Sequence, residues 1–246
     1  MTVTESPTRP PSPGRRDAGD DSFLLPDGSR VTIAAPDLDT SGIWNCLFMA
    51  RTAGTRESFS VAPRRDDRAQ LHGLTDTTVH PYRDAELLVG YDPQRGEMLA
   101  SWRGPWHEVV NLRTGPRIGS DRFVRLFDAF RITDTQDGVR MAPRRAVEFE
   151  PFHVFKIIPG VGDLHIQRPH EADTPAPAWR GAPARHGEIW RKEGTDNGEV
   201  KRARKDTLIL GTTNAIAELI ANPGDTADDG AAAEFLTTLN ITWSTP

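Results

Sequence analysis

"ELLVGYDPQRGEMLASWRGPWHEVV", residues 86–110, is the stretch that decides the fold. One apolar run ends at Asp92, a short polar segment containing Gly96 follows, and a second apolar run then leads to a Trp- and His-rich end. Two apolar runs joined by a segment rich in Asp, Pro and Gly are typical of a β-hairpin. The stretch therefore predicts two adjacent antiparallel strands.

The end of this stretch, "SWRGPWHE", is the first candidate for contact with a ligand. Pro105 has no backbone N–H, so residues 104–107 are expected at the end of a strand and not inside it. Trp102 is then the better candidate for the core. Trp106 and His107 are the better candidates for the surface.

Composition limits the classes of protein that fit. A chain of 246 residues with 37% hydrophobic content can bury a sizeable core, and its net charge of -5 gives no overall attraction to nucleic acid. The single cysteine, Cys46, excludes an intramolecular disulfide and a multi-cysteine zinc site. No run of about 18 apolar residues could span a membrane, and no apolar signal core is found, so we expect a cytoplasmic protein without membrane contact.

One segment has clear helical periodicity, "GSDRFVRLFDAFRI", residues 119–132. Ser120 is a good N-cap, and apolar residues recur at i, i+3, i+4 and i+7. These residues form one helical face: Phe123, Leu126, Phe127 and Phe130. The face predicts an amphipathic helix that packs on a sheet.

Strand patterns lie on both sides of this helix. A hairpin is expected from Phe23–Leu25 to Val31–Ala34 through a Pro-Asp-Gly turn, and near-alternating apolar residues run from Val147 to Ile158. The fold class that these patterns indicate is α+β, with a curled, mostly antiparallel β-sheet and one amphipathic helix packed on it. A C-terminal helical or irregular region completes the expected architecture.

Changes in amino-acid composition along the chain indicate four parts. Residues 1–21 combine Pro, Ser, Thr and mixed charge with little apolar content, which predicts a disordered tail. The α+β core domain is expected over residues 22–158, with a Pro- and Gly-rich loop and a basic segment over 159–206. C-terminal helices are expected over 207–246, at about Thr212–Ala221 and Ala231–Leu239.

Searches for catalytic motifs find no complete signature. Nucleophile elbows, phosphate loops, dinucleotide fingerprints and H-E-x-x-H are absent as sequence patterns, so no catalytic residue, metal-ligand set or cofactor is predicted. A small metal-dependent hydrolase or nuclease stays open as an alternative, with a site in 159–206. It would need some of these residues to converge: His165, His170, Glu188, Glu199 and Lys201.

Arginine placement favours a different interpretation. Residues 112–145 hold eight arginines, no lysine and four aspartates. Arginine binds phosphate with two parallel hydrogen bonds and stacks on bases, which suits a nucleic-acid groove, although ordinary solvated surface explains the same composition. The candidate nucleic-acid-binding residues are Trp106, His107, Arg113, Arg117, Arg122, Arg125, Arg202 and Arg204.

The order of these elements resembles a known family. The segments that carry the resemblance are Gly90-Tyr91-Asp92-Pro93, Trp102 to His107, Ser120 to Ile132 and Val139 to Phe155. Over residues 40–158 the chain is similar to the methylase-associated X1 type of domain of bacterial restriction and modification proteins. Where that family has a serine-rich piece before the helix, this chain has "VVNLRTGPRIG" and keeps only Ser120.

The resemblance implies a DNA-binding module that recognises plain or modified DNA in a restriction or defence system. DNA is then the expected partner, together with a partner protein or nuclease subunit. The metal-dependent hydrolase or nuclease is the second hypothesis, and a non-catalytic protein-interaction subunit is the third.

Overall fold

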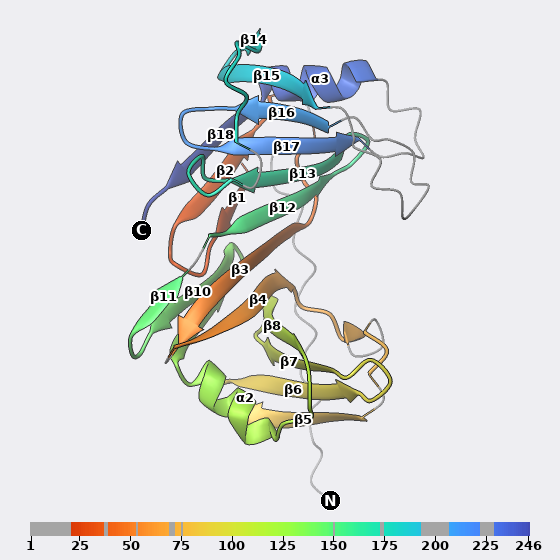
Figure 1. The fold of residues 1–246 in the computed structure, drawn as a ribbon, viewed down its shortest axis with the longest axis vertical. Helices are drawn as coiled ribbons and strands as arrows, with labels where there is room; N and C mark the ends of the chain where they lie inside the picture. Colours follow the sequence, from red (N-terminus) through yellow and green to blue (C-terminus); the bar gives the residue numbers. More distant parts are fainter. Residues whose placement is uncertain are drawn as a thin grey trace, which may run out of the picture.

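The computed structural model describes residues 21–36, 39–52, 54–68, 72–74, 76–149, 151–172, 175–192, 207–221 and 229–246. Within these residues, two β-sheets are accompanied by two α-helices (Figure 1). The expectation of a mostly antiparallel sheet with some helix is confirmed. The finer expectation of one curled sheet with one amphipathic helix is not, because the strands divide between two sheets. Neither described helix is long and apolar enough to cross a membrane.

The smaller sheet contains five described strands in the order β18-β2-β1-β10-β9. Their bounds are β1 (Asp21–Leu24), β2 (Arg30–Ala34), β9 (Phe130–Thr135), β10 (Gly138–Pro143) and β18 (Asn240–Ser244). The expected hairpin is confirmed, since Phe23 of β1 pairs with Val31 of β2. β10 joins β1 in parallel at Gly138, where a Cβ would lie 2.3 Å from the carbonyl oxygen of Leu24. Glycine is therefore needed for the two backbones to approach.

The larger sheet contains thirteen described strands, and twelve follow the order β14-β15-β16-β17-β13-β12-β3-β4-β8-β7-β6-β5. Residues 44–114 form six of these strands: β3 (Trp44–Thr52), β4 (Thr55–Pro63), β5 (Asp76–Tyr82), β6 (Ala85–Asp92), β7 (Glu97–Arg103) and β8 (His107–Thr114). The other seven described strands lie between residues 147 and 221: β11 (Val147–Phe149), β12 (His153–Ile158), β13 (Gly162–Gln167), β14 (Ala182–Ala184), β15 (Gly187–Lys192), β16 (Thr207–Gly211) and β17 (Ile216–Ala221). β11 pairs with β3 beside β12.

The main core lies between the two sheets. Phe23 of the smaller sheet stacks on Trp44 of the larger one, with ring centroids 5.7 Å apart. Phe59 of β4 meets Phe130 of β9 edge to face at 5.9 Å. Aromatic pairs of this kind add stability beyond the apolar area that they bury. These contacts make one face of the larger sheet an inner face and leave the opposite face outward.

The predicted helix is present but shorter than its periodicity suggested. α2 (Ser120–Phe127) is capped by Gly119 without a side-chain hydrogen bond, so the N-cap role expected of Ser120 is wrong. Phe123 and Phe127 are buried as predicted. The helix ends before Phe130, which opens β9 and reaches the same core from a strand.

The C-terminal part adds strands where helices were expected. The helix expected over Thr212–Ala221 is wrong, because Ile216–Ala221 forms β17 between β13 and β16. α3 (Asp229–Thr238) confirms the second C-terminal helix and packs against β14, β16 and β17. The sheet continues across the boundary expected near Pro159, since β12 and β13 pair directly. Asp21, which the sequence assigned to the tail, is the first residue of β1.

A buried lysine joins the two sheets. Lys156 of β12 has no exposed side-chain surface, and its Nζ lies 2.7 Å from Oδ2 of Asp21 in β1. The same ammonium donates to the carbonyl oxygen of Gly42 and lies 4.5 Å from the ring centroid of Trp44. A buried charge persists only where such partners compensate for lost hydration. Lys156 is thus a structural cation that links β12 to β1.

The opening stretch forms the expected hairpin, β6 to β7, in which Tyr91 pairs with Met98. The Asp92 carboxylate organises its turn. It accepts hydrogen bonds from the amides of Gln94 (2.8 Å) and Arg95 (3.3 Å) and from Nε of Arg95 (2.6 Å). The Asp of "GYDP" therefore has a structural role within its own turn.

We expect replacement of Asp92 by Asn to make the stability of the protein less dependent on acid pH. The Arg95 guanidinium, followed by the two amides, lowers the pKa of the Asp92 carboxyl group. A lowered pKa in the folded state adds stability above the unfolded value, about 3.9, and this stability is lost as pH falls through the folded value. Urea midpoints of the two proteins should differ near neutral pH and converge below about pH 4. A constant difference at every pH would contradict this role.

Candidate functional site

The Trp- and His-rich end of the opening stretch forms a tight connection between β7 and β8. The amide of Gly104 donates to the carbonyl oxygen of His107 (2.9 Å). The Asp134 carboxylate of β9 accepts hydrogen bonds from the amides of Trp106 (2.6 Å) and His107 (3.0 Å) and lies 2.8 Å from Nδ1 of the His107 ring. A Cβ at Gly104 would lie 2.4 Å from this carboxylate, so the close approach requires glycine.

These contacts hold His107 inside the protein. Its side chain is 10% exposed, and its ring meets Phe23 edge to face at 6.0 Å. The surface position expected for His107 is therefore wrong, whereas the core position expected for Trp102 is confirmed at 4% exposure. Trp106 is partly exposed. The connection is anchored by a carboxylate that the sequence did not single out.

The arginines that the sequence singled out are mostly ion-paired. The pairs are Arg113 with Glu57 (3.4 Å), Arg117 with Asp76 (2.5 Å) and Arg125 with Asp121 (2.7 Å). Arg122 is exposed on α2, and within the described residues it has no ion pair. Arg202 and Arg204 lie outside the described residues. Pairing offsets much of the positive charge, so DNA contact by this set stays a prediction from the sequence.

The residues of the hydrolase hypothesis do not assemble into a metal site. His165 contacts His153 at 2.8 Å, while His170 lies 3.5 Å from a carboxylate oxygen of Glu171. Glu188 accepts a hydrogen bond from the Gly181 amide. Across the described part of the chain, no three His, Cys, Asp or Glu side chains are grouped to hold a metal. The described residues do not include Glu199 and Lys201.

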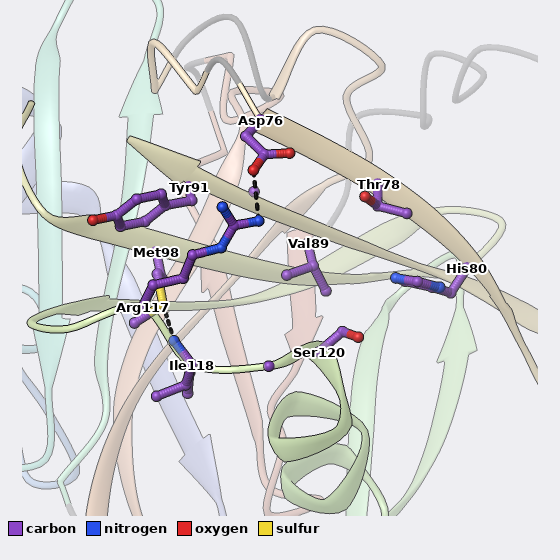
Figure 2. Close-up of a pocket in the computed structure, with 11 residues that line it drawn as sticks. Asp76, Thr78, His80, Val89, Tyr91, Met98, Arg117, Ile118 and Ser120 are labelled. Atoms are coloured by element: carbon purple, nitrogen blue, oxygen red, sulfur yellow. Dashed lines mark hydrogen bonds and ion pairs between the residues drawn. The ribbon is translucent and has the colours of Figure 1, made fainter. Parts of the chain in front are cut away.

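A pocket lies where β5 to β7 meet the start of α2. It has a volume of about 160 Å³, and Figure 2 shows the side chains that line it. Its apolar lining comes from Val89, Met98 and Ile118, and its polar lining includes Thr78, His80 and Ser120. The Sδ atom of Met98 accepts a hydrogen bond from the Ile118 amide (3.2 Å), which holds the segment before α2 against β7.

Arg117 is the cation of this pocket. Its guanidinium forms the ion pair with Asp76 and lies 5.4 Å from the ring centroid of Tyr91 (Figure 2). The two charged side chains are 62% and 50% exposed. An ion pair this exposed contributes about 0–1 kcal/mol, so another carboxylate can replace Asp76 at low cost.

The same pocket borders the edge of the larger sheet. β5 is the last strand in the order, and no described strand pairs with its outer side. Pro81 has no N–H to give to β6, so it belongs to the alternate positions whose backbone groups point away from the sheet. Thr77 and Val79 share this alternation, and Val79 is 50% exposed. Their backbone groups are available to another strand.

Sequence reasoning missed this site, including Asp76, Thr78 and His80. The available signal was "DTTVHPY", in which β-branched residues precede a proline, a pattern typical of an edge strand. Arg117 was named, but as a phosphate contact. Its pairing with Asp76 joins residues forty-one positions apart, which no local pattern indicates.

Comparisons with known proteins do not identify a family. No family model matches the chain, and no curated protein matches it. Among solved structures, the chain is similar to the immunity protein TplEi of the T6SS from Pseudomonas aeruginosa, complexed with the "L" peptide. The identity is 12%, the match covers 92% of this chain and 99% of that one, and the TM-score is 0.37. A likeness at this level does not establish a common fold.

Proposed function

We propose that this protein is a non-catalytic protein-interaction module that captures an extended segment of a partner protein along β5. The segment adds one strand to the larger sheet, and an acidic side chain of the segment enters the adjoining pocket. The observation that carries the proposal is the outer edge of β5, with which no described strand pairs, directly beside a pocket that contains a cation.

Backbone pairing supplies the first part of the recognition. Strand addition uses main-chain hydrogen bonds for affinity and pockets for alternate side chains for selectivity. The outward backbone groups of Thr77 and Val79 provide donors and acceptors, and the neighbouring β-branched side chains favour an extended partner. Pro81 limits the paired length at one end.

The charge of Arg117 supplies the second part of the proposed recognition. Arg117 keeps its positive charge at any physiological pH and presents a planar fork that matches a carboxylate. Its present partner, Asp76, is half exposed, so a carboxylate from the partner segment gains a better-shielded position inside the pocket. Arg122, exposed in the first turn of α2, is a further cation close in sequence to the pocket residues Arg117 to Ser120.

A displayed library of random short peptides, selected on the whole protein, tests the proposal. We expect the selected peptides to alternate β-branched residues and to carry Asp or Glu. Replacing Val79 by Pro removes one outward N–H and should weaken these peptides about two- to tenfold, since a hydrogen bond contributes about 0.5–1.5 kcal/mol. Replacing Val79 by Thr keeps the N–H and serves as the matched control.

Arg117→Ala separates the two parts of the recognition. It should weaken acidic peptides and leave their Asn or Gln versions unchanged. Peptides that bind Val79→Pro as well as the unaltered protein would overturn strand addition. Failure to enrich any peptide would overturn the proposal, as would a dimer in which β5 pairs with β5 of a second copy.

A further inference from the structure

We infer that His153 and His165 form a binding site for a divalent transition-metal ion on the outward face of the larger sheet. This site is remote in sequence from the β5 pocket and does not depend on it. The two rings come from neighbouring antiparallel strands, β12 and β13. Nε2 of His153 and Nδ1 of His165 lie 2.8 Å apart.

The spacing of these nitrogens suits one shared ion. Imidazole nitrogens bind metal ions at about 2.0–2.1 Å, so two of them lie about 2.9 Å apart at the right angle of a square-planar or octahedral ion and about 3.3 Å apart at a tetrahedral zinc ion. The observed separation is 2.8 Å, and because the two nitrogens face each other across a hydrogen bond, both rings must turn for their lone pairs to meet at one ion. Imidazole also suits nickel and copper ions, whose geometries contain such right angles.

The two histidines are accessible because they lie on the outward face of the sheet. Val154 and Lys156 are fully buried, so the alternating residues His153 and Phe155 face outward. Both histidines are partly exposed. The Phe155 ring stacks on His165 with centroids 5.9 Å apart and an interplanar angle of 21°, which holds the imidazole in orientation.

A carboxylate residue lies on the strand next to the two histidines. Glu218 of β17 lies directly opposite His165 in the register, and directly opposite side chains have Cβ atoms about 4.5–5.5 Å apart. Glu218 is partly exposed, and it makes no ion pair with any other described residue. In the present arrangement the three groups do not converge, so the two histidines are the primary ligands and Glu218 completes the set by turning its side chain.

The hydrogen bond between the rings explains how the site is held without metal. One ring donates its N–H to the lone pair of the other. To bind one ion through both nitrogens, the donor ring carries its proton on its other nitrogen instead, so both rings bind as neutral imidazoles.

Calorimetric titration of the full chain with zinc chloride, and separately with nickel chloride, tests the site. We expect saturable binding of one ion per chain. His153→Ala and His165→Ala should each weaken binding about tenfold or more, and Glu218→Gln should weaken it less. His170→Ala is the matched control, because that histidine is 76% exposed and lies outside the pair.

Thermal unfolding with and without zinc provides the second readout. Zinc should raise the Tm of the unaltered protein and of His170→Ala, and should raise the Tm of His165→Ala less. Equal zinc affinity in His165→Ala and the unaltered protein would overturn the site. The absence of saturable binding by the unaltered protein would overturn it as well.

Discussion

Replacing Lys156 by Met is expected to lower the free energy of unfolding by about 3–5 kcal/mol. The methionine keeps most of the side-chain volume but removes the charge that Asp21 faces across 2.7 Å. Asp21 is 14% exposed, so its carboxylate would remain in the interface between the sheets without the Lys156 ammonium. A loss of this size is a large part of the total stability of a domain. Urea unfolding followed by circular dichroism measures it.

Two further variants make the Lys156 experiment specific. The double variant Asp21→Asn with Lys156→Met removes both charges and should be more stable than Lys156→Met alone, because the carboxylate that faced the lysine is removed with it. Lys192→Met replaces an exposed lysine of β15 and should change stability by about 0.5 kcal/mol or less. A loss below about 1 kcal/mol for Lys156→Met would contradict the structural role of the pair.

Replacing Asp134 by Ala is expected to cost about 2–4 kcal/mol and to loosen the β7–β8 connection. The change removes the acceptor of two backbone amides, at Trp106 and His107, and the partner of the His107 ring. Each buried donor left without an acceptor costs about 1–3 kcal/mol. Hydrogen exchange should accelerate at the amides of Trp106 and His107 more than elsewhere in the sheet, and denaturant unfolding gives the overall loss.

Asp134→Asn separates the acceptor role of this residue from its charge. The amide oxygen can still accept from a backbone N–H, so the loss should be smaller than for alanine. Asp137→Ala, near the turn that follows β9, is the matched control, because its side chain is 45% exposed and its ion pair with Arg30 spans 3.4 Å. Unchanged exchange at Trp106 in Asp134→Ala would show that the carboxylate does not hold the connection.

Local patterns predicted the elements that depend on neighbouring residues. The β6–β7 hairpin follows from its turn residues, and the buried face of α2 follows from the spacing of Phe123 and Phe127. The same spacing included Phe130 in the helix, although that ring reaches the core from β9. β17 was mistaken for a helix because Ala and Leu occur among its residues and have high helical propensity, which tertiary pairing overrides.

Local sequence patterns could not predict the features that depend on residues far apart in the chain. Alternation in "HVFKII" predicts a strand but not which face is buried, and the structure turns Lys156 inward and Ile157 outward. The inward lysine depends on Asp21, which is 135 positions earlier. The β5 pocket and the His153–His165 pair likewise require the strand order, which periodicity does not determine.

The position of β18 in the smaller sheet also affects how the chain reaches its native state. Residues 240–244 pair with residues 30–34, so an N-terminal hairpin acquires its neighbour only after the intervening chain has been synthesised. Pairings of such long sequence separation slow folding, because the entropy of closing the loop is lost before the contact is made. During synthesis, the outer side of β2 therefore stays open to other strands until residues 240–244 leave the ribosome.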